Sequence, residues 1–267
     1  MIDIHTHLLP EFDDGPRSMD DTRRMLALAE KDGTTEIILT SHILSPADFD
    51  REEEILEKFK QVKDIVKKDG RKLKIYLGGE IFLHPDTELN KAFTTFNNNG
   101  KYVLVEFGMR AIPEFVPKKI FDWTMNGILP ILAHPERLLP IIKNPKYAYR
   151  FVQMGASLQV NAGSLLGIFG DSVKKCAQEL LEHDLVHFVA SDGHDIRSRS
   201  ISLKKAYNLV SSQYGLSKAE VLFEMNPIRA ILGDELIKSE PIAFEERNNG
   251  SRRWQALKRK FGLIREP

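Results

Sequence analysis

The chain has 267 residues, of which 42% are hydrophobic and 28% charged, a composition typical of folded globular proteins. Its 38 basic and 38 acidic residues balance, so the protein lacks the excess positive charge with which most nucleic-acid-binding proteins attract their partner. The single cysteine, Cys176, excludes an internal disulfide and predicts a reducing, cytoplasmic environment, and no apolar run is long enough to predict a transmembrane segment.

Seven short runs rich in apolar and β-branched residues alternate with segments of helical periodicity. The runs cover residues 2–4, 35–40, 73–77, 102–105, 128–132, 157–160 and 186–190. Their near-continuous apolar character is typical of strands buried on both faces of a parallel sheet. Ser18 and Asp21 predict the N-terminus of a helix that ends at Gly33. Further helices are expected over 46–70, 86–96, 113–126, 145–154, 172–183 and 200–214, and after a capping box of Ser217 with Glu220.

Nine side chains that can bind a metal lie at or after the ends of these runs. They are His5, His7, Asp14, His42, Glu80, Glu106, His134, Asp192 and His194. Six of the seven runs lead into such a residue, and the sixth run ends at Asn161. A (β/α) barrel gathers the C-terminal ends of all its strands on one rim, whereas an open sheet gathers ligands only at its switch point. We therefore expect an α/β fold with a barrel-like ring of seven strands and a metal site at their C-terminal ends.

The types of ligand narrow the choice of metal. In His5-Thr6-His7, both imidazoles point to the same side of a strand, so they can share one ion. Imidazole and carboxylate ligands without thiolate favour manganese, iron, zinc or cobalt. Nine ligands exceed the needs of one ion, so we expect two or three divalent ions. Ions roughly 3.5–4 Å apart can generate a bridging hydroxide at neutral pH, which is hydrolytic chemistry.

Two arginines indicate that the substrate carries a phosphate. Arg137 follows the candidate ligand His134 by three residues, and Arg199 lies on the loop after the last run. A guanidinium group matches phosphate oxygens with two parallel hydrogen bonds and stabilises charge during phosphoryl transfer. We interpret Arg137 and Arg199 as the catalytic, phosphate-binding pair, with Arg17 and Arg197 as weaker candidates nearby.

Other reactive side chains have simpler interpretations. A cysteine-dependent phosphatase needs an arginine six residues after its nucleophile, but Glu182 takes that place after Cys176, which we expect in the core. His187 lies beside the turn at the start of the last run and is expected to be structural. Asn161 and Ser164 follow the sixth run and could contact the ligands or the substrate.

The series of motifs resembles a known family. In chain order the motifs are DIHTHLLPEFDDGP, TSH at 40–42, GGE at 78–80, VEF around Glu106, AHPER at 133–137, NAG at 161–163 and SDGH at 191–194. Together they resemble the PHP (polymerase and histidinol phosphatase) superfamily, and closely its bacterial capsule-type protein-tyrosine phosphatases. The resemblance implies a distorted seven-stranded (β/α) barrel with a trinuclear centre, typically of manganese.

The resemblance also implies how the ligands are shared. The first ion would take His5, His7, Glu80 and Asp192, the second Glu80, Glu106 and His134, and the third Asp14, His42 and His194. Arg137 and Arg199 fall where the family has its phosphate-binding arginines. We hypothesise that a metal-bridging hydroxide attacks phosphorus without forming a phosphoenzyme. The implied substrate is the phosphotyrosine tail of a membrane-associated kinase that controls capsule or exopolysaccharide export.

The end of the chain differs from the rest. Residues 1–245 are expected to form one phosphatase domain, and 246–267 a basic tail. Trp254, Leu257, Phe261 and Ile264 recur there at helical spacing, which is typical of an amphipathic helix. The tail could pack against the domain or bind a partner or an anionic membrane surface, and the sequence leaves oligomerisation open.

Three other functions remain open from the sequence. An amidohydrolase that cleaves C–N bonds also carries HxH on its first strand, although the carboxylated lysine typical of such sites is replaced here by Glu106. A small-molecule phosphatase, such as one for histidinol phosphate, would have the same site chemistry. A binding module that has lost its activity would be expected to lack ligands, and none of the nine is missing.

Overall fold

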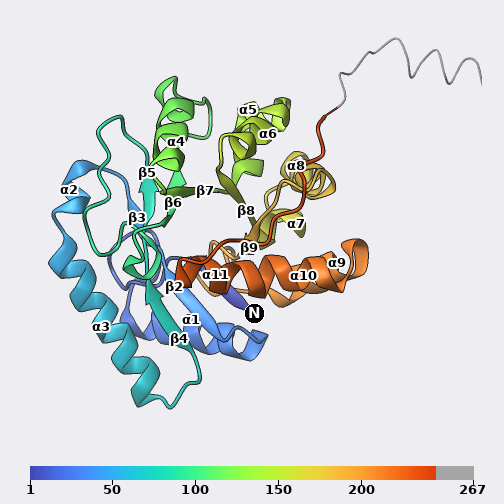
Figure 1. The fold of residues 1–267 in the computed structure, drawn as a ribbon. Coiled ribbons are helices and arrows are strands. Elements are labelled where there is room, and N and C mark those ends of the chain that lie inside the picture. The colour runs from blue at the N-terminus through green and yellow to red at the C-terminus, as the bar shows by residue number, and fades with distance from the viewer. Residues whose placement is uncertain (245–267) are drawn as a thin grey trace, which may run out of the picture.

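The computed structural model describes residues 1–244, in which short parallel strands are surrounded by helices (Figure 1). One sheet has the order β1-β2-β4, formed by β1 (Ile2–Thr6), β2 (Glu36–Leu39) and β4 (Lys74–Leu77). The other has the order β3-β5-β6-β7-β8-β9, formed by β3 (His42–Ile43), β5 (Glu80–Phe82), β6 (Tyr102–Glu106), β7 (Leu129–Ala133), β8 (Ser157–Asn161) and β9 (Phe188–Ala190). All the strand pairs are parallel.

The α/β class with parallel strands is confirmed, whereas the single closed ring of seven strands is not found among residues 1–244. Seven stretches of chain do supply the strands, but the second and third stretches are each broken in two, at 40–41 and at 78–79. Backbone pairing continues across the break, because the N–H of Glu80 donates to the carbonyl oxygen of Ser41 at 3.1 Å. The two stretches therefore belong to one sheet before the break and to the other after it.

The first and last stretches of strand meet beyond the end of β9. The backbone N–H of Asp192 donates to the carbonyl oxygen of His5 at 2.9 Å, and that of His7 donates to Gly193 at the same distance. An isolated parallel bridge joins Thr6 to Gly193. These contacts bring the HxH motif of the N-terminus next to the DGH motif near residue 193.

Helices follow most strands and cover the outside. Their bounds are α1 (Met19–Asp32), α2 (Pro46–Phe49), α3 (Glu52–Lys68), α4 (Phe115–Met125), α5 (Leu139–Lys143), α6 (Lys146–Gln153), α7 (Ala162–Leu165), α8 (Asp171–Glu182), α9 (Lys204–Tyr214), α10 (Leu216–Glu220) and α11 (Asn226–Leu232). Short turns of other helix types are η1 (Phe96–Asn98), η2 (Pro135–Arg137) and η3 (Val221–Met225). No helix within residues 1–244 is long and apolar enough to cross a membrane.

The local signals at the first helix are confirmed. The Ser18 side chain accepts a hydrogen bond from the N–H of Asp21, and Gly33 ends α1 in the left-handed conformation. The capping box predicted at Ser217 is wrong, because the helix α10 is capped two residues earlier, at Gly215, and begins at Leu216. The expected helix over 46–70 is split into α2 and α3 at residues 50–51.

The helix expected over 86–96 is also wrong, since only the short turn η1 forms there. The Thr94 hydroxyl donates to the carbonyl oxygen of Lys91 at 2.7 Å, and the Thr95 hydroxyl accepts from the N–H of Gly100 at 3.0 Å. Such bonds between a threonine side chain and the nearby backbone compete with helical hydrogen bonding. The segment forms a loop, and its apolar residues pack into the core from that loop; Phe93, for example, is fully buried.

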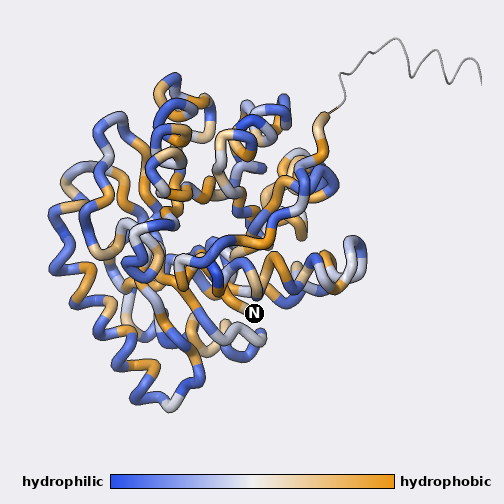
Figure 2. The backbone as a smooth tube through the Cα atoms, viewed as in Figure 1, coloured by the Kyte–Doolittle hydropathy of each residue, from blue (hydrophilic) through white to orange (hydrophobic). Residues whose placement is uncertain are grey.

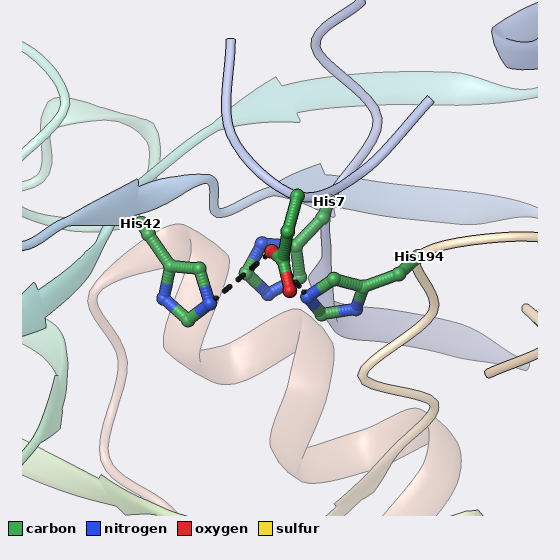
Figure 3. Close-up of side chains that lie close together, drawn as sticks. His7, His42 and His194 are labelled. Atoms are coloured by element: carbon green, nitrogen blue, oxygen red, sulfur yellow. Dashed lines mark ion pairs between the residues drawn. The ribbon is translucent and has the colours of Figure 1, made fainter. Parts of the chain in front are cut away.

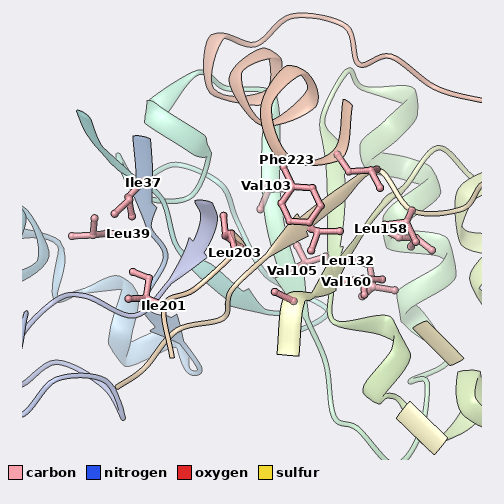
Figure 4. Close-up of a cluster of buried hydrophobic side chains, with 14 of the residues drawn as sticks. Ile37, Leu39, Val103, Val105, Leu132, Leu158, Val160, Ile201, Leu203 and Phe223 are labelled. Carbon is pink, nitrogen blue, oxygen red and sulfur yellow. The ribbon is translucent and has the colours of Figure 1, made fainter. Parts of the chain in front are cut away.

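The core lies between the strands and the covering helices, and hydrophobic stretches concentrate along the strands (Figure 2). Labelled members from the strands in Figure 4 are Ile37, Leu39, Val103, Val105, Leu132, Leu158 and Val160. Cys176 on α8 belongs to the same cluster with 3% of its surface exposed. The prediction that Cys176 lies in the core is therefore confirmed, and burial raises the pKa of its thiol to about 12.

His187 is a buried, neutral histidine just before β9. Its Nδ1 accepts a hydrogen bond from the backbone N–H of Leu158 at 3.2 Å, and burial together with the charge of Lys238 lowers its pKa from 6.5 to about 3. Between these two values, the unfolded chain binds a proton that the folded chain does not bind. Stability present above pH 6.5 is therefore lost as the pH falls through this window.

Replacing His187 with Asn should remove this acid sensitivity, because the Oδ1 of Asn can accept the same hydrogen bond without titrating. Below pH 6, the free energy of unfolding of the unmodified protein should fall more steeply than that of His187→Asn, by up to about 1.4 kcal/mol per pH unit. Urea unfolding of both proteins between pH 5 and 7.5 measures the difference. A difference that does not change with pH would contradict the assignment.

Candidate metal centre

The nine predicted ligands converge at or beyond the C-terminal ends of β1, β2, β4, β6, β7 and β9. His5 lies in β1, His42 in β3, Glu80 at the start of β5 and Glu106 at the end of β6, while the other five lie on loops that follow a strand. Seven of the nine side chains are at most 10% exposed; the exceptions are His42 at 18% and Asp14 at 58%. The predicted convergence is therefore found, although the strands do not form one closed ring.

Glu80 occupies the middle of the cluster. Its Oε2 lies 3.1 Å from His5 Nε2, 3.3 Å from His7 Nε2 and 3.0 Å from His42 Nδ1. Its Oε1 forms a hydrogen bond of 2.8 Å with His134 Nε2. A fully buried carboxylate surrounded by four imidazoles is an arrangement in which one side chain can serve two ions.

A second group lies beside Glu80, where His7, His42 and His194 surround a carboxylate (Figure 3). Asp14 Oδ1 lies 3.0 Å from His194 Nε2 and 3.5 Å from His42 Nε2. One donor atom from each of these four residues lies within 4.8 Å of the donor atoms of the others. The structure brings together Asp14, His42 and His194, the ligands of the expected third site, and adds His7 to them.

The remaining expected group, Glu80 with Glu106 and His134, is less compact. His134 Nε2 is 3.8 Å from Glu106 Oε2, whereas Glu106 Oε1 lies 3.1 Å from His42 Nδ1. His42 thus faces Asp14 with one ring nitrogen and both glutamates with the other. The structure brings all three residues together but does not divide the ligands uniquely between ions.

The donor atoms fit divalent cations. Among the described residues, the buried side-chain atoms without a hydrogen-bond partner include Glu80 Oε2, His42 Nδ1, His134 Nδ1 and His194 Nε2. Leaving buried polar atoms unpaired is costly, and a bound cation satisfies such lone pairs. Nitrogen and oxygen donors without sulfur are the set that manganese, iron and zinc accept.

The charges of the site are strongly coupled. Burial opposes ionisation of Glu80, but His5, His134 and His42 around it hold the pKa of the carboxyl well below its usual value. Burial likewise disfavours charge on His42, yet the carboxylates of Glu106 and Glu80, which lie 3.1 and 3.0 Å from its Nδ1, raise the pKa of this imidazole to about 10. The Glu80 carboxylate is thus held ionised although it is buried, as cation binding requires.

Both predicted arginines meet at Asp192. Arg137 Nη1 donates to Asp192 Oδ2 at 3.0 Å, and Arg199 Nη2 donates to Oδ1 at 2.9 Å. Arg199 Nη1 also donates to Asp14 Oδ2 at 3.1 Å, and the Phe169 ring lies 4.6 Å from the guanidinium carbon of Arg137. The two guanidinium groups therefore border the ligand cluster together.

The weaker arginine candidates are placed differently. Arg17 and Arg197 are exposed, and within residues 1–244 neither forms an ion pair.

Asp13 is a residue that the sequence interpretation missed. Its Oδ2 accepts hydrogen bonds from His7 Nδ1 at 2.8 Å and from the backbone N–H of His42 at 3.0 Å. Its Oδ1 accepts from the N–H of Gly15, where a Cβ atom would lie 2.7 Å from the carbonyl oxygen of His7. One carboxylate thereby orients the His7 ring and ties together three stretches that carry ligands. The adjacent acids in FDDG were the available signal, but they do not tell which acid faces inward.

A second missed residue is Gln159, a polar side chain within the apolar strand β8. Its Oε1 forms a 2.8 Å hydrogen bond with His5 Nδ1, and its Nε2 donates to Asn161 Oδ1 at 2.9 Å. Asn161 Nδ2 in turn donates to Asp192 Oδ2 at 2.7 Å. The expected contact between Asn161 and a ligand is thus found, whereas Ser164 instead donates to Glu136 Oε1 at 2.5 Å.

Known proteins are similar to this chain in sequence and in architecture. A family model described as "Capsular polysaccharide synthesis, CpsB/CapC" matches residues 1–232. Tyrosine-protein phosphatase CpsB of Streptococcus pneumoniae is 36% identical over 244 residues, which cover 89% of this chain and 100% of that protein. Tyrosine-protein phosphatase YwqE of Bacillus subtilis is 33% identical over 226 residues, which cover 84% of this chain and 89% of that protein.

A solved structure agrees with these matches. It comes from crystal structures of YwqE from Bacillus subtilis and CpsB from Streptococcus pneumoniae, described as metal-dependent tyrosine phosphatases. The match has a TM-score of 0.84 at 29% identity and covers 92% of this chain and 100% of the other.

Proposed function

The chain belongs to the CpsB/CapC family of capsular polysaccharide synthesis proteins, and on that premise we propose that it is a metal-dependent protein-tyrosine phosphatase. The observation that carries the proposal is the meeting of Arg137 and Arg199 at Asp192, on the border of the ligand cluster. A metal site alone would serve many hydrolases, but a pair of guanidinium groups beside it selects a substrate with a phosphate.

We assign the nine ligands to two or three divalent ions in the three groups that the family pattern implies. Manganese is the proposed metal, and iron and zinc are compatible with the same donors. Bound ions would supply Lewis acidity and activate water for attack on phosphorus. Asp13 and Gln159 would act on the ligands, because a partner on the far nitrogen of a histidine sets its tautomer and orientation.

The arginines perform the part of the reaction that belongs to the chain itself. Each uses one or two N–H groups on Asp192 or Asp14 and keeps further donors for phosphate oxygens. Phe169 packs against the guanidinium of Arg137 and limits its motion. A phenol leaving group has a pKa of about 10 and therefore needs less protonation than an aliphatic alcohol. Direct transfer to water without a phosphoenzyme is the proposed course.

The first experiment compares substrates with and without metal. Purified protein is incubated with a phosphotyrosine peptide, a phosphoserine peptide and histidinol phosphate, each with Mn²⁺ and then with a chelator. Metal-dependent release of phosphate from the phosphotyrosine peptide is expected to exceed release from the other two. Preferential hydrolysis of histidinol phosphate would replace this proposal with the small-molecule phosphatase.

Replacing Asp13 with Asn should weaken metal binding without removing a ligand. Asparagine has the same size as aspartate, but it is uncharged and only one of its two terminal atoms, the oxygen, can accept hydrogen bonds. The hydrogen bonds that hold His7 and His42 would therefore lose their charged acceptor. We expect the metal affinity to fall by about 10–100-fold. Activity titrated against Mn²⁺ measures this, and saturating Mn²⁺ should restore most of the turnover. Unchanged metal dependence in Asp13→Asn would refute a positioning role.

Partners and the tail remain part of the proposal. We propose that the physiological substrate is a phosphotyrosine protein, specifically a membrane-associated kinase of capsule synthesis, and that the single cysteine reflects a cytoplasmic location. Residues 1–245 would form the phosphatase domain. The amphipathic helix predicted in 246–267 lies outside the described residues, and its role stays a prediction.

A further inference from the structure

A second cationic feature lies on the rim, next to the proposed site. The loop after β6 and the helices α5 and α6 form a shallow groove of about 370 Å³. Its lining residues are Arg110, Leu139, Pro140, Lys143, Asn144 and Tyr147. We call it the α5 groove.

The α5 groove is lined by residues that closely follow Glu106 and Arg137 in the chain. Arg110 lies four residues after Glu106, and Leu139 lies two residues after Arg137. The backbone N–H of Leu139 donates to the carbonyl oxygen of Met109 at 2.8 Å, which joins the loop after β6 to the start of α5. Two residues of extended chain span at most about 7.2 Å, so Leu139, which lines the groove, lies within that distance of the Arg137 backbone.

The charge of the α5 groove is unbalanced. Arg110 and Lys143 are both exposed, and within residues 1–244 neither forms an ion pair or a side-chain hydrogen bond. No carboxylate lines the groove. Leu139 is 42% exposed, Tyr147 38% and the adjacent Met109 39%. The surface thus combines two cationic side chains without partners and several exposed apolar side chains. Such a surface can bind a peptide, with the cations facing an acidic side chain and the apolar residues facing the rest of the peptide.

We propose that the α5 groove binds an acidic side chain of the protein substrate, about two to four residues from the phosphotyrosine. The inference rests on the proposed function and adds a substrate preference to it. Arg137 and Arg199 already bind the phosphate in that proposal, so the groove engages only substrates that extend beyond the phosphorylated residue. An extended chain rises about 3.3 Å per residue, so residues two to four positions from the phosphotyrosine lie roughly 7–13 Å from it along the peptide.

The test compares phosphotyrosine peptides whose flanking positions carry either glutamate or alanine. The unmodified protein with Mn²⁺ should show a kcat/KM roughly tenfold higher for the glutamate peptides, mainly through a lower KM. The double variant Arg110→Ala/Lys143→Ala should lose that preference while hydrolysing the alanine peptides as before. Added salt should reduce the preference in the unmodified protein, because the groove is open to solvent.

A matched control removes the same charge elsewhere. Lys67 and Lys68 are exposed in the last turn of α3, which lies away from α5 and α6 (Figure 1), and form no ion pair within residues 1–244. Lys67→Ala/Lys68→Ala should keep the preference for glutamate peptides. Metal content and hydrolysis of p-nitrophenyl phosphate, which has no flanking residues, show whether the metal site is intact in each variant.

Two results would overturn the inference: equal kcat/KM for glutamate and alanine peptides, or an equal loss of preference in the groove and α3 variants. Failure of the proposed function would look different. In that case the metal-loaded unmodified protein would hydrolyse no phosphotyrosine peptide of either kind, and the inference would fall with it.

Discussion

Glu80→Gln is expected to lower phosphotyrosine peptide hydrolysis by more than about 100-fold and to reduce the amount of bound metal. The two oxygens of Glu80 lie within 3.3 Å of nitrogens from four histidines. More of the proposed ligands therefore surround Glu80 than surround any other proposed carboxylate ligand. Loss of a residue that merely orients a ligand costs about 10–100-fold, and loss of a shared ligand should cost more. The amide keeps the volume of the side chain but removes its charge.

Elemental analysis of purified protein and phosphate release from a phosphotyrosine peptide measure the two effects. Glu136→Gln is the matched control, because Glu136 is equally buried on the same rim. Its Oε1 accepts from the N–H of Asn161 and from the Ser164 hydroxyl, and an amide oxygen can keep both bonds. Burial also raises the pKa of Glu136, so its charge is less firmly held than that of Glu80. Full metal content and activity in Glu80→Gln would refute its role as a shared ligand.

Arg137→Ala is expected to reduce turnover by about 10²–10³-fold while the metal content stays unchanged. Arg137 donates to Asp192 but is not itself a ligand, and its free donors are proposed to bind the phosphate oxygens. Losing one such preorganised donor typically costs this much in kcat. Arg137→Lys should recover only part of the activity, because an ammonium group cannot form two parallel hydrogen bonds.

Steady-state kinetics with a phosphotyrosine peptide, combined with elemental analysis, test this expectation. Arg197→Ala serves as the control, because Arg197 is an exposed arginine two residues before Arg199 and forms no ion pair within the described residues. It should retain activity within about twofold, as exposed side chains without partners contribute little. Wild-type turnover in Arg137→Ala would remove this arginine from the proposed mechanism.

The breaks in the second and third stretches of strand show a limit of periodicity. The runs 35–40 and 73–77 predict strands, and β2 and β4 confirm them. The chain then continues into β3 and β5 of the other sheet, where His42 and Glu80 lie. An apolar run indicates that a strand is buried, but it carries no information on the sheet with which the next residues pair.

The charged groups show the same limit more sharply. Arg137 and Arg199 were recognised from their distance in sequence to ligands, but their meeting at the two oxygens of Asp192 depends on how the loops after β7 and β9 pack. Arg110 and Lys143 are 33 residues apart, and nothing in the sequence indicates that they line the same groove. The sequence predicts the strand or helix on which a side chain lies, but the partners of that side chain belong to other elements, whose packing the sequence pattern does not predict.

The sequence by itself determined the α/β class, the alternation of strand and helix, the ends of α1 and the identity of the nine residues that converge. These features depend on local capping, on apolar runs and on the rule that parallel strands present their C-terminal ends together. Only the tertiary structure decided that Glu80 stands at the centre, that Asp13 faces His7, and that the strands divide into two sheets. The physical reason is that hydrogen bonds and ion pairs between elements form only after the backbone has packed, and their geometry is not encoded in the spacing of residues along one element.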